Sequence, residues 1–590
     1  MKKTLNIFPT KLKNFFKNYF FLNDDAYLKK GFQLISSNGK NKLLVLIFIS
    51  SISALLDLVG IGLIIPLLLS IAFGSNEMFS SIIPEQFIRF SEPSFVIILF
   101  TFFISVKVFI SIYVVYYRSE TSYMISADLS HRLVSALIKK PNLFHIKFSS
   151  GTASRLAIVE CHNFAQSFIT PIVVLFSEGI CLIAIFLFLL SIDPIFSSVI
   201  MVFFIATGFL FRQVTKNRIS QASFNRANSD EKRVNLIETF SSISLETSRK
   251  PQRKWLNRLY EISNNNSRDA SAAYLFWSNL AKPYLETLIY FLVIIFVAYS
   301  IFLTESVSSS NLSELILFFV LAAVRSLPSS TRVISAMSSM RYSESSINQI
   351  SLNLDMVNGS DDGTLNKVVY VNESNLNVEV NNYRVKLDDA QLTKIDDFCI
   401  NRRGLIYVDG PSGSGKSSFF THLAGIRDDF LGSIEISHNS SEGNKIISYC
   451  PQKVFLISGT LKENVFLGLD PSESQLELLK MYSVAFNLNN FINSDDHDIT
   501  NAMVRNFGLE FSGGQRQRIA ILRGLLSSSR IILFDEPLAS LDKEYRNYLI
   551  DMLCELSKTK IIFISSHVDR ELLIQNADSI IKTEIINSNV

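Results

Sequence analysis

One eight-residue stretch, from Gly410 to Ser417, restricts the fold of this chain more than any other feature. It reads G-P-S-G-S-G-K-S and fits the pattern G-x-x-x-x-G-K-[ST] at every fixed position. The apolar run 405–408 before it is typical of a buried strand, and residues 418–424 after it have helical spacing. Strand, loop and helix in this order predict a loop whose backbone N–H groups face phosphate oxygens at the N-terminus of a helix.

The residue types in this loop suit a bound phosphate group. Glycines let the backbone turn its N–H groups inward, Lys416 adds a positive charge, and Ser417 offers a hydroxyl to Mg²⁺. A glycine- and serine-rich turn that fits by chance is the alternative, and the flanking strand and helix argue against it. We therefore expect the nucleotide phosphates to contact Gly410, Pro411, Ser412, Gly413, Ser414, Gly415, Lys416, Ser417 and Ser418.

A second apolar run ends in two carboxylates. Residues 530–536 read R-I-I-L-F-D-E, which predicts a buried strand that ends at a site. We expect Asp535 to hold Mg²⁺ through water and Glu536 to polarise the attacking water as a general base. Two acids beside a turn at a strand end are common on their own, but a phosphate-binding loop upstream favours the catalytic interpretation.

Shorter motifs accompany these two. Gln452 follows a short apolar strand, and its amide can reach both Mg²⁺ and the attacking water. Residues 511–515 read F-S-G-G-Q, a second phosphate-binding loop that we expect to be completed only by a second copy of the domain. His567 ends another apolar strand. A lone histidine is usually a surface or core residue, but in this position it is a candidate sensor of the γ-phosphate.

Residues 376–582 resemble the nucleotide-binding domain of an ATP-binding cassette (ABC) transporter. The stretch from Gly410 to Ser417 is similar to its Walker A motif, and Phe534 to Glu536 are similar to the end of Walker B. The other matches are Gln452 with the Q-loop, Ser512, Gly513, Gly514 and Gln515 with the signature motif, Ser540 to Asp542 with the D-loop, and His567 with the switch histidine. Phe511 stands where the family usually has leucine.

The resemblance implies an α/β P-loop ATPase domain that binds ATP and Mg²⁺. It also implies that two cassettes stack head to tail, with ATP between one Walker A motif and the partner's signature loop, and that Asp542 belongs to this nucleotide site. In the family an aromatic residue about 25 residues before Walker A stacks on the adenine. Tyr383 lies near that distance, but the strand register places the position closer to Leu387, so Tyr383 can equally be an ordinary strand residue.

The apolar residues concentrate in the first 335 positions, where six stretches approach the roughly 20 residues that cross a bilayer. These stretches are 43–73, 95–117, 172–192, 194–214, 284–304 and 312–334. One such stretch fits a buried helix of a soluble protein, but six in one half of a 590-residue chain favour a membrane domain. We therefore expect a multi-domain chain, with an all-α transmembrane domain of six helices at 43–340 and the ATPase domain at 376–590.

The segments outside these two domains have distinct compositions. Residues 1–42 are rich in lysine and phenylalanine, which favours a cytoplasmic amphipathic segment over a signal peptide, because no short apolar core with a cleavage site precedes the first span. Residues 341–375 are rich in serine and asparagine and are interpreted as a linker. Residues 141–151 resemble the first coupling segment of exporter-type ABC proteins, and 235–243 occupy the matching place before the fifth span.

Charge sets the expected orientation. Lysine and arginine are abundant before the first span and in both long connectors, whereas 74–94 and 305–311 nearly lack them. The positive-inside rule therefore places the N-terminus and the cassette in the cytoplasm, which suits a multi-pass protein of the cell (inner) membrane. The net charge of +3 gives no reason to expect nucleic acid as a partner, and the five cysteines have no paired spacing that predicts a disulfide. One membrane domain with one cassette is a half-transporter, so a homodimer is the simplest assembly.

Charged residues inside the spans are the candidates for contact with a transported molecule. Arg325, Arg332 and Lys107 suit an anionic headgroup such as pyrophosphate, and the alternative is pairing within the membrane, for example of Asp57 with Arg325. Residues 55–66 and 323–333 are loosely similar to the branch of exporters that flips lipid-linked oligosaccharides, in which 78–90 would supply a short external helix. ATP-driven flipping or export of such an amphipathic substrate is thus expected, and export of a peptide, antibiotic or other natural product is the alternative.

Overall fold

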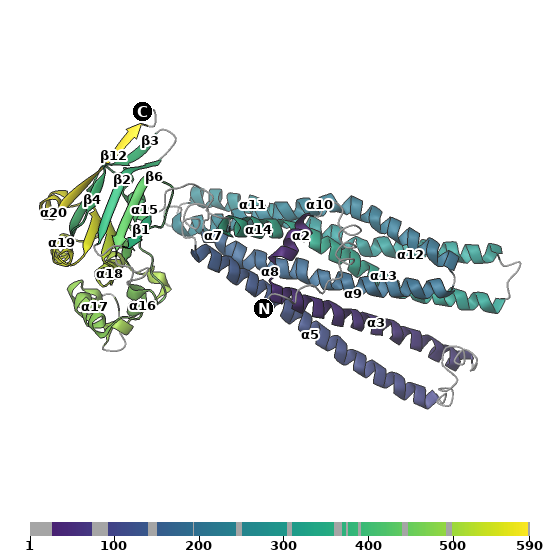
Figure 1. Cartoon of the computed structure of the whole chain (residues 1–590). Coiled ribbons are helices and arrows are strands. Elements are labelled where there is room, and N and C mark those ends of the chain that lie inside the picture. Colours follow the sequence, from purple (N-terminus) through teal and green to yellow (C-terminus); the bar gives the residue numbers. More distant parts are fainter. Residues whose placement is uncertain are drawn as a thin grey trace. The chain divides into compact units, whose positions relative to one another are not determined.

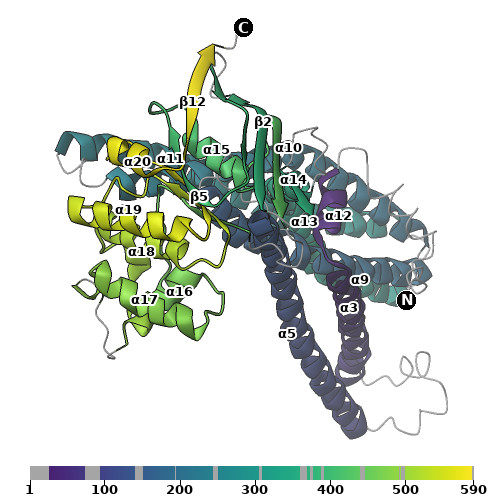
Figure 2. The same ribbon diagram turned by 60° about the vertical axis from the view of Figure 1, so that its left-hand side comes forward.

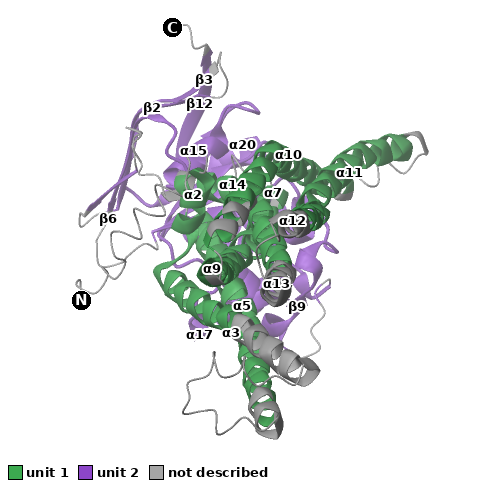
Figure 3. Ribbon diagram, turned by 90° about the vertical axis from the view of Figure 1, so that its right-hand side faces the viewer, with its two compact units in different colours: residues 1–359 green, residues 360–590 purple. Residues whose placement is uncertain are grey.

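The computed structural model describes residues 26–73, 93–139, 150–192, 194–243, 250–303, 309–358, 368–372, 376–386, 391–438, 446–490, 492 and 498–587. The chain divides into two compact units, Met1–Gly359 and Ser360–Val590 (Figure 3). Unit 1 is helical in its described part, and unit 2 is built around a β-sheet. The proposed external helix at 78–90, most of the first coupling segment and residues 1–25 lie outside the described residues.

Long helices that run side by side form unit 1 (Figures 1 and 2). They are α2 (Ala26–Leu34), α3 (Ser37–Phe73), α5 (Pro93–Lys139), α7 (Ser150–Ser154), α8 (Cys161–Phe164), α9 (Thr170–Ile192), α10 (Pro194–Ile243), α11 (Lys250–Asn279), α12 (Ala281–Leu303), α13 (Ser309–Tyr342) and α14 (Glu344–Asn358), with π-helical turns η3 (Arg155–Glu160) and η4 (Ala165–Ile169) flanking α8. Helix α3 packs on α5 and α9, α9 on α13, and α10 on α11.

Each of the six predicted spans falls on one of these helices, as the all-α prediction requires. Among the described residues, the three stretches Ser37–Leu56, Thr101–Lys139 and Gly151–Ser191 are long and apolar enough to cross a membrane. Large apolar side chains remain exposed on α5, including Phe109 at 75% and Ile112 at 62%. Exposed apolar surface of this extent on a long helix suits contact with lipid.

Two segments that composition places outside the domains pack inside unit 1. Tyr27 and Leu34 of α2 lie in the same hydrophobic core as Ile347 and Ile350 of α14. Helix α14 therefore occupies part of the stretch 341–375 that is predicted to be a linker, and strand β1 occupies another part. Their apolar residues recur with the spacing of a buried helix face, which outweighs the serine- and asparagine-rich composition.

Unit 2 contains a ten-stranded sheet in the order β1-β6-β2-β3-β12-β5-β11-β10-β7, with β4 paired to β2, and a small pair of β8 with β9. The strands are β1 (Val369–Asn372), β2 (Asn377–Lys386), β3 (Gln391–Ile395), β4 (Phe398–Ile400), β5 (Gly404–Asp409), β6 (Leu431–His438), β7 (Ile447–Cys450), β8 (Gly459–Thr460), β9 (Met503–Val504), β10 (Ile531–Asp535), β11 (Ile561–Ser565) and β12 (Ser579–Asn587). The helices are α15 (Lys416–Leu423), α16 (Leu461–Phe466), α17 (Glu473–Ala485), α18 (Gly513–Leu525), α19 (Lys543–Ser557) and α20 (Arg570–Asn576), with 3₁₀ turns η6 (Leu488–Asn490), η7 (Ile499–Asn501) and η8 (Asn506–Gly508).

Three neighbouring parallel strands of this sheet are fully buried. Every residue of β5, β10 and β11 is buried, as expected for parallel strands that are covered on both faces. Tyr383 of β2 is also completely buried, and its hydroxyl oxygen lies 2.7 Å from Nδ1 of His422. Tyr383 is therefore a core residue rather than an exposed platform for adenine.

Candidate functional site

The site begins where four parallel strands end. β5, β10, β11 and β7 are parallel neighbours, and the register sets Asp535 opposite Ser565, and Ser565 opposite Val408. Their carboxyl ends therefore meet at one edge of the sheet, which is where open α/β sheets bind ligands. The residues that follow these ends are Gly410, Glu536, His567 and Gln452.

The loop from Gly410 to Ser417 leads directly into helix α15. Gly413 has a φ of +78° and Gly415 a φ of +84°, which is the left-handed region that favours glycine. A Cβ at Gly415 would lie 2.5 Å from the Thr393 hydroxyl, so both space and backbone require glycine there. Ser412 and Ser417 are exposed at the surface of the loop, and Ser418 is partly buried. The exposed N-terminus of α15 leaves this loop open to a phosphate group.

Two threonines from distant strands hold the loop in place. The Ser414 hydroxyl lies 2.6 Å from the hydroxyl of Thr583 on β12, and Thr583 also donates to the carbonyl oxygen of Asp409 over 3.2 Å. Thr393 on β3 donates to the carbonyl oxygen of Ser414 over 2.9 Å. Neither threonine belongs to a local motif, so sequence reasoning did not find them.

Lys416 is buried and points back over the loop. Its ammonium donates to the carbonyl oxygens of Gly410 and Pro411, each over 2.9 Å, and lies 3.0 Å from Nε2 of His567. Burial lowers the pKa of Lys416, although three nearby carboxylates, led by Glu536, act in the opposite direction. The cation is therefore placed where it can stabilise an anion bound in the loop.

The two acids at the end of β10 have different surroundings. Asp535 is buried, and its two oxygens accept hydrogen bonds from Ser565 over 2.9 Å and from Tyr449 over 3.2 Å. Glu536 lies 3.3 Å from Nε2 of His567 and has a φ of +51°, a left-handed backbone that is held by the hydrogen bond from its N–H to the Ser565 carbonyl over 3.0 Å. A strained backbone of this kind is frequent at functional sites.

A salt bridge joins the base of the loop to the segment that carries the histidine. Arg570 donates to both oxygens of Asp409, from Nε over 3.0 Å and from Nη2 over 2.7 Å. Burial alone would raise the pKa of Asp409, but the hydrogen bond and charge of Arg570 outweigh it, so this pKa lies below its ordinary value. His567 is three residues from Arg570, and the bridge therefore fixes the histidine relative to the loop.

The second loop forms the start of helix α18. Ser512 is the N-cap, and its hydroxyl accepts from the N–H of Gln515 while the Gln515 side chain accepts from the N–H of Ser512 over 2.8 Å. A Cβ at Gly514 would lie 2.4 Å from the carbonyl oxygen of Ser540, so glycine allows the loop to pack on the neighbouring turn. A Cβ at Gly513 would lie 3.9 Å from the Ser540 hydroxyl, and Gly513 is exposed. The start of α18 is therefore accessible to a ligand.

The remaining predicted residues surround these two loops. Gln452 is exposed just after β7, and Phe511 is buried under the second loop. The side chain of Asp542 is 82% exposed, with one oxygen 3.5 Å from Arg518 Nη2. The Ser417 hydroxyl and the Asp535 carboxylate are hard oxygen donors, the ligand type that Mg²⁺ prefers.

The charged residues of the spans fall into three cases. Arg332 Nε on α13 lies 3.0 Å from Glu178 Oε1 on α9, so Arg332 has a partner inside unit 1. The sequence analysis left pairing within the membrane as the alternative to substrate binding. For Arg332 the structure shows such a pair, with Glu178 as the acid. Lys107 is partly buried on α5. The side chains of Arg325 and Asp57 lie outside the described residues.

Comparisons with known proteins show what this chain is similar to. A protein-family model described as "ABC transporter" matches residues 393–539. A putative export ATP-binding/permease protein of Rickettsia bellii is 32% identical over 242 residues, which cover 40% of this chain and 37% of that protein. An ATP-dependent lipid A-core flippase of Photorhabdus laumondii is 25% identical over 492 residues, 80% of each chain.

The fold has a match among solved structures. A bacterial Atm1-family ABC exporter with ATP bound has a TM-score of 0.70 and 13% sequence identity, and the match covers 93% of each chain. The fold is therefore that of an ABC exporter, a helical unit fused to a cassette. Residues 393–539 of unit 2 match the ABC transporter family model, and the loop from Gly410 to Ser417 lies within them.

Proposed function

We propose that the chain is an ATP-driven membrane transporter that works as a homodimer by alternating access and flips or exports an amphipathic substrate, such as a lipid-linked oligosaccharide. One observation carries the proposal. The cluster of Lys416, Glu536 and His567 lies in the same chain as helices that are long and apolar enough to cross a membrane. The residues proposed to hydrolyse ATP and the helices proposed to cross the bilayer thus belong to one polypeptide chain.

The cluster provides the parts that phosphoryl transfer to water needs. Lys416 and the loop N–H groups bind the phosphates, Glu536 takes the proton of the attacking water, and His567 contacts the γ-phosphate. Gln452 orients the attacking water. Ser417, Gln452 and Asp535 would hold Mg²⁺, which would neutralise part of the phosphate charge.

The dimer follows from the second loop. Ser512, Gly513, Gly514 and Gln515 form an exposed helix N-terminus, which is a ready anion site. With Asp542 of the same chain, this loop closes over the ATP that a partner's Gly410–Ser417 loop holds. Two copies of one chain provide two complete sites of this kind. The membrane is the inner cell membrane, with the cassette and the N-terminus in the cytoplasm, where ATP is available.

The substrate class rests on two points. The lipid A-core flippase aligns over 80% of this chain, an alignment that must include much of the helical unit. Arg325 and Lys107 are cations that suit an anionic headgroup such as pyrophosphate. Arg332 pairs with Glu178 but remains half exposed, so it can still contact such a group. Export of a peptide, an antibiotic or another natural product is the alternative.

Transport in proteoliposomes tests the proposal. The full-length protein is reconstituted with a fluorescent polyprenyl-pyrophosphate sugar, and a membrane-impermeant quencher reports the leaflet of the label. We expect Mg-ATP to move the label across the bilayer in the wild type and not in Glu536→Gln. ATP hydrolysis without movement of this probe, combined with ATP-dependent uptake of a labelled peptide, would establish the alternative. A wild type that moves neither probe contradicts the transporter proposal.

A further inference from the structure

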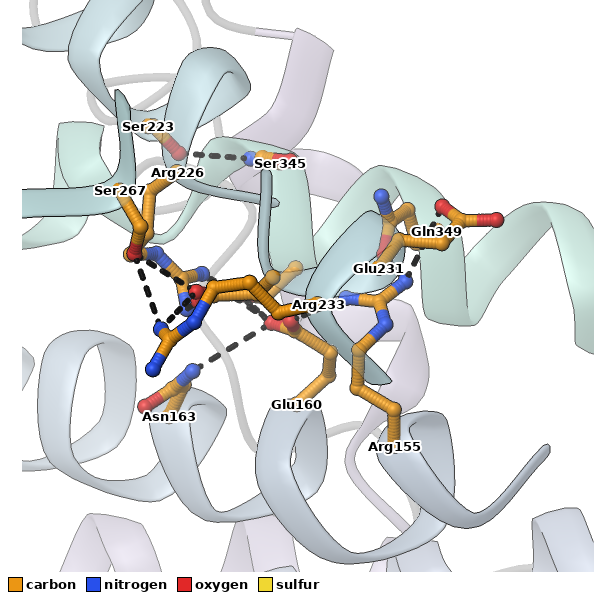
Figure 4. A network of polar contacts seen from close by, with 12 residues as sticks. Arg155, Glu160, Asn163, Ser223, Arg226, Glu231, Arg233, Ser267, Ser345 and Gln349 are labelled. Carbon is orange, nitrogen blue, oxygen red and sulfur yellow. Dashed lines mark hydrogen bonds and ion pairs between the residues drawn. The ribbon is translucent and has the colours of Figure 1, made fainter. Parts of the chain in front are cut away.

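A buried carboxylate joins two arginines in the helical unit. Glu160, at the end of η3, is completely buried. Its Oε1 lies 2.6 Å from Nη1 of Arg155 on the same π-helical turn, and its Oε2 lies 3.2 Å from Nη2 of Arg226 on α10 (Figure 4). Both arginine side chains are less than one-tenth exposed. Two distant stretches of the chain therefore meet at one acid.

Helix α14 is attached to this cluster through two polar side chains. The Ser346 hydroxyl donates to Glu160 Oε2, and Arg226 Nη2 donates to the same hydroxyl over 3.3 Å. One turn further along α14, the Gln349 side-chain oxygen accepts from Arg155 Nη2 over 2.7 Å (Figure 4). Residues three apart lie on one helix face, so a single face of α14 faces all three charges.

The charges extend outward to a third helix. Glu231 lies 3.6 Å from Arg155, and Asp230 lies 3.4 Å from Arg226. Arg233 Nη1 lies 3.0 Å from the other oxygen of Asp230, so three arginines face three carboxylates. Asp230 also accepts from Ser267 on α11 over 2.7 Å. The cluster thus connects η3, α10, α11 and α14, and each of its formal charges has an opposite charge nearby.

Stability alone does not explain such a cluster. Replacing a buried ion-pair triad by apolar residues of similar volume is often neutral or stabilising, so buried charges are weak evidence of a contribution to folding. Charged hydrogen bonds instead fix geometry, because they require defined directions. The acid and one arginine lie on a π-helical turn, a local irregularity that is frequent at functional sites.

The position of α14 in the chain, directly before unit 2, points to a function for this cluster. Helix α14 ends at Asn358 and is the last element of unit 1, and unit 2 begins at Ser360. Any displacement of the chain that arises in the cassette and travels along the covalent connection must therefore reach α14 first. The elements bonded to α14 continue into the span helices: η3 continues through α8 and η4 into α9, and Arg226 lies on α10, which begins as a span.

We propose that Arg155, Glu160 and Arg226, bonded to Ser346 and Gln349 of α14, form the joint that transmits ATP-driven movement from α14 to the span helices. This inference rests on the proposed function. The five residues are positioning residues, because they belong to neither the ATP-binding loops nor the span charges. They hold α14 so that its movement is converted into movement of α9 and α10.

The sharpest test removes the hydrogen bonds between α14 and this cluster and leaves the charges paired. In S346A/Q349A both of these side-chain contacts are lost, while Glu160 keeps both arginines and the apolar face of α14 stays packed in the core. The matched control is S351A, because the Ser351 hydroxyl donates to Asp355 of the same helix over 3.2 Å and so bonds within α14 rather than to the cluster. In S346A/Q349E an acceptor for Arg155 is restored. Full-length proteins in phosphatidylethanolamine–phosphatidylglycerol nanodiscs are assayed for ATPase kinetics and for hydrogen–deuterium exchange of α9 and α10, with and without Mg-ATP and orthovanadate.

We expect S346A/Q349A to keep the KM for ATP within about two-fold of wild type, while the ATP-dependent change in exchange of α9 and α10 falls about five-fold. S351A should behave as wild type, and S346A/Q349E should recover at least part of the change. If the double variant does not fold, S346A replaces it, and we expect a smaller loss of the ATP-dependent change in exchange. If S346A/Q349A or S346A keeps the full ATP-dependent change in exchange, the proposed role of the cluster is wrong, while the proposed transport function is unaffected. A wild type without any ATP-dependent change in α9 and α10 overturns both the joint and the proposed transport.

Discussion

The ammonium of Lys416 lies 3.0 Å from Nε2 of His567, although the two residues are 151 positions apart. Adjacent parallel strands, β5 and β11, deliver them to the same edge of the sheet. Lys416 also donates to two carbonyl oxygens of its own loop. A γ-phosphate would offer both side chains a stronger, charged acceptor, so ATP is expected to replace these contacts by contacts to itself.

Lys416→Ala should therefore weaken ATP binding. The loss of one charge-assisted hydrogen bond to phosphate is worth about 2 kcal/mol, which corresponds to roughly 30-fold in Kd. Binding of a fluorescent ATP analogue to the full-length protein measures this change. Lys558→Ala is the control, because Lys558 is exposed and pairs only locally with Glu555. Equal Kd values for Lys416→Ala and the control would contradict the role given to Lys416.

Glu536→Gln should separate binding from hydrolysis. The amide keeps the shape of the side chain but cannot accept a proton from water, so we expect kcat to fall by about 10²- to 10⁴-fold while ATP still binds. Phosphate release and nucleotide binding, measured on the same preparation, report the two steps. Glu544→Gln, an exposed change at the start of α19, should leave both unchanged. Hydrolysis at the wild-type rate in Glu536→Gln would mean that another group acts as the base.

Thr583→Val should loosen the phosphate-binding loop from a distance. The substitution removes the hydroxyl that bonds Ser414 and the Asp409 carbonyl, and unpaired buried polar groups cost about 1–3 kcal/mol. We expect a lower melting temperature of the cassette and a KM for ATP that rises more than kcat falls. Thr559→Val, at an exposed threonine, provides the comparison. An unchanged KM in Thr583→Val would show that the loop does not depend on this anchor.

The meeting of Lys416, Glu536 and His567 was predictable because each lies in a segment that follows a short apolar strand, and parallel strands bring their carboxyl ends together. Thr393 and Thr583 were not predictable, since contacts across 21 and 169 residues depend on the order of strands in the sheet rather than on a local motif. Helix α14 did carry a signal: Ile347, Ile350 and Leu354 are spaced as one helix face, and all three are buried. Composition hid that signal, because polar residues surround it.

The pair of Glu178 and Arg332 should stabilise the contact between α9 and α13. We expect Glu178→Ala and Arg332→Ala each to lower the melting temperature in detergent, and the double variant to lose less than the sum of the two. A coupling energy of at least about 0.5 kcal/mol is expected for residues in direct contact. Additive losses would instead show that the two side chains contribute independently. That result would favour the prediction that Arg332 binds an anionic substrate group.

Acid should destabilise the cassette through His422. This side chain is fully buried, with Nε2 2.9 Å from Asp429 Oδ1 and Nδ1 2.7 Å from the Tyr383 hydroxyl. A neutral imidazole fits both contacts, donating to Asp429 and accepting from Tyr383. Burial lowers the pKa of His422, although the hydrogen bond to Asp429 acts in the opposite direction. The folded-state pKa thus lies below the value of about 6.5 expected in the unfolded chain.

Because the unfolded state binds a proton more readily, stability is fully present above about pH 6.5 and is lost as the pH falls toward the folded-state pKa. Calorimetry of the full-length protein between pH 8 and 5 measures this loss, with the cassette transition identified by its shift on adding ATP. His422→Phe removes the titrating group, so its transition should change less over this range. At pH 8 it should be less stable than wild type by about 1–3 kcal/mol, since Tyr383 and Asp429 lose a partner. Parallel pH profiles of the two proteins would exclude His422 as the source of the acid sensitivity.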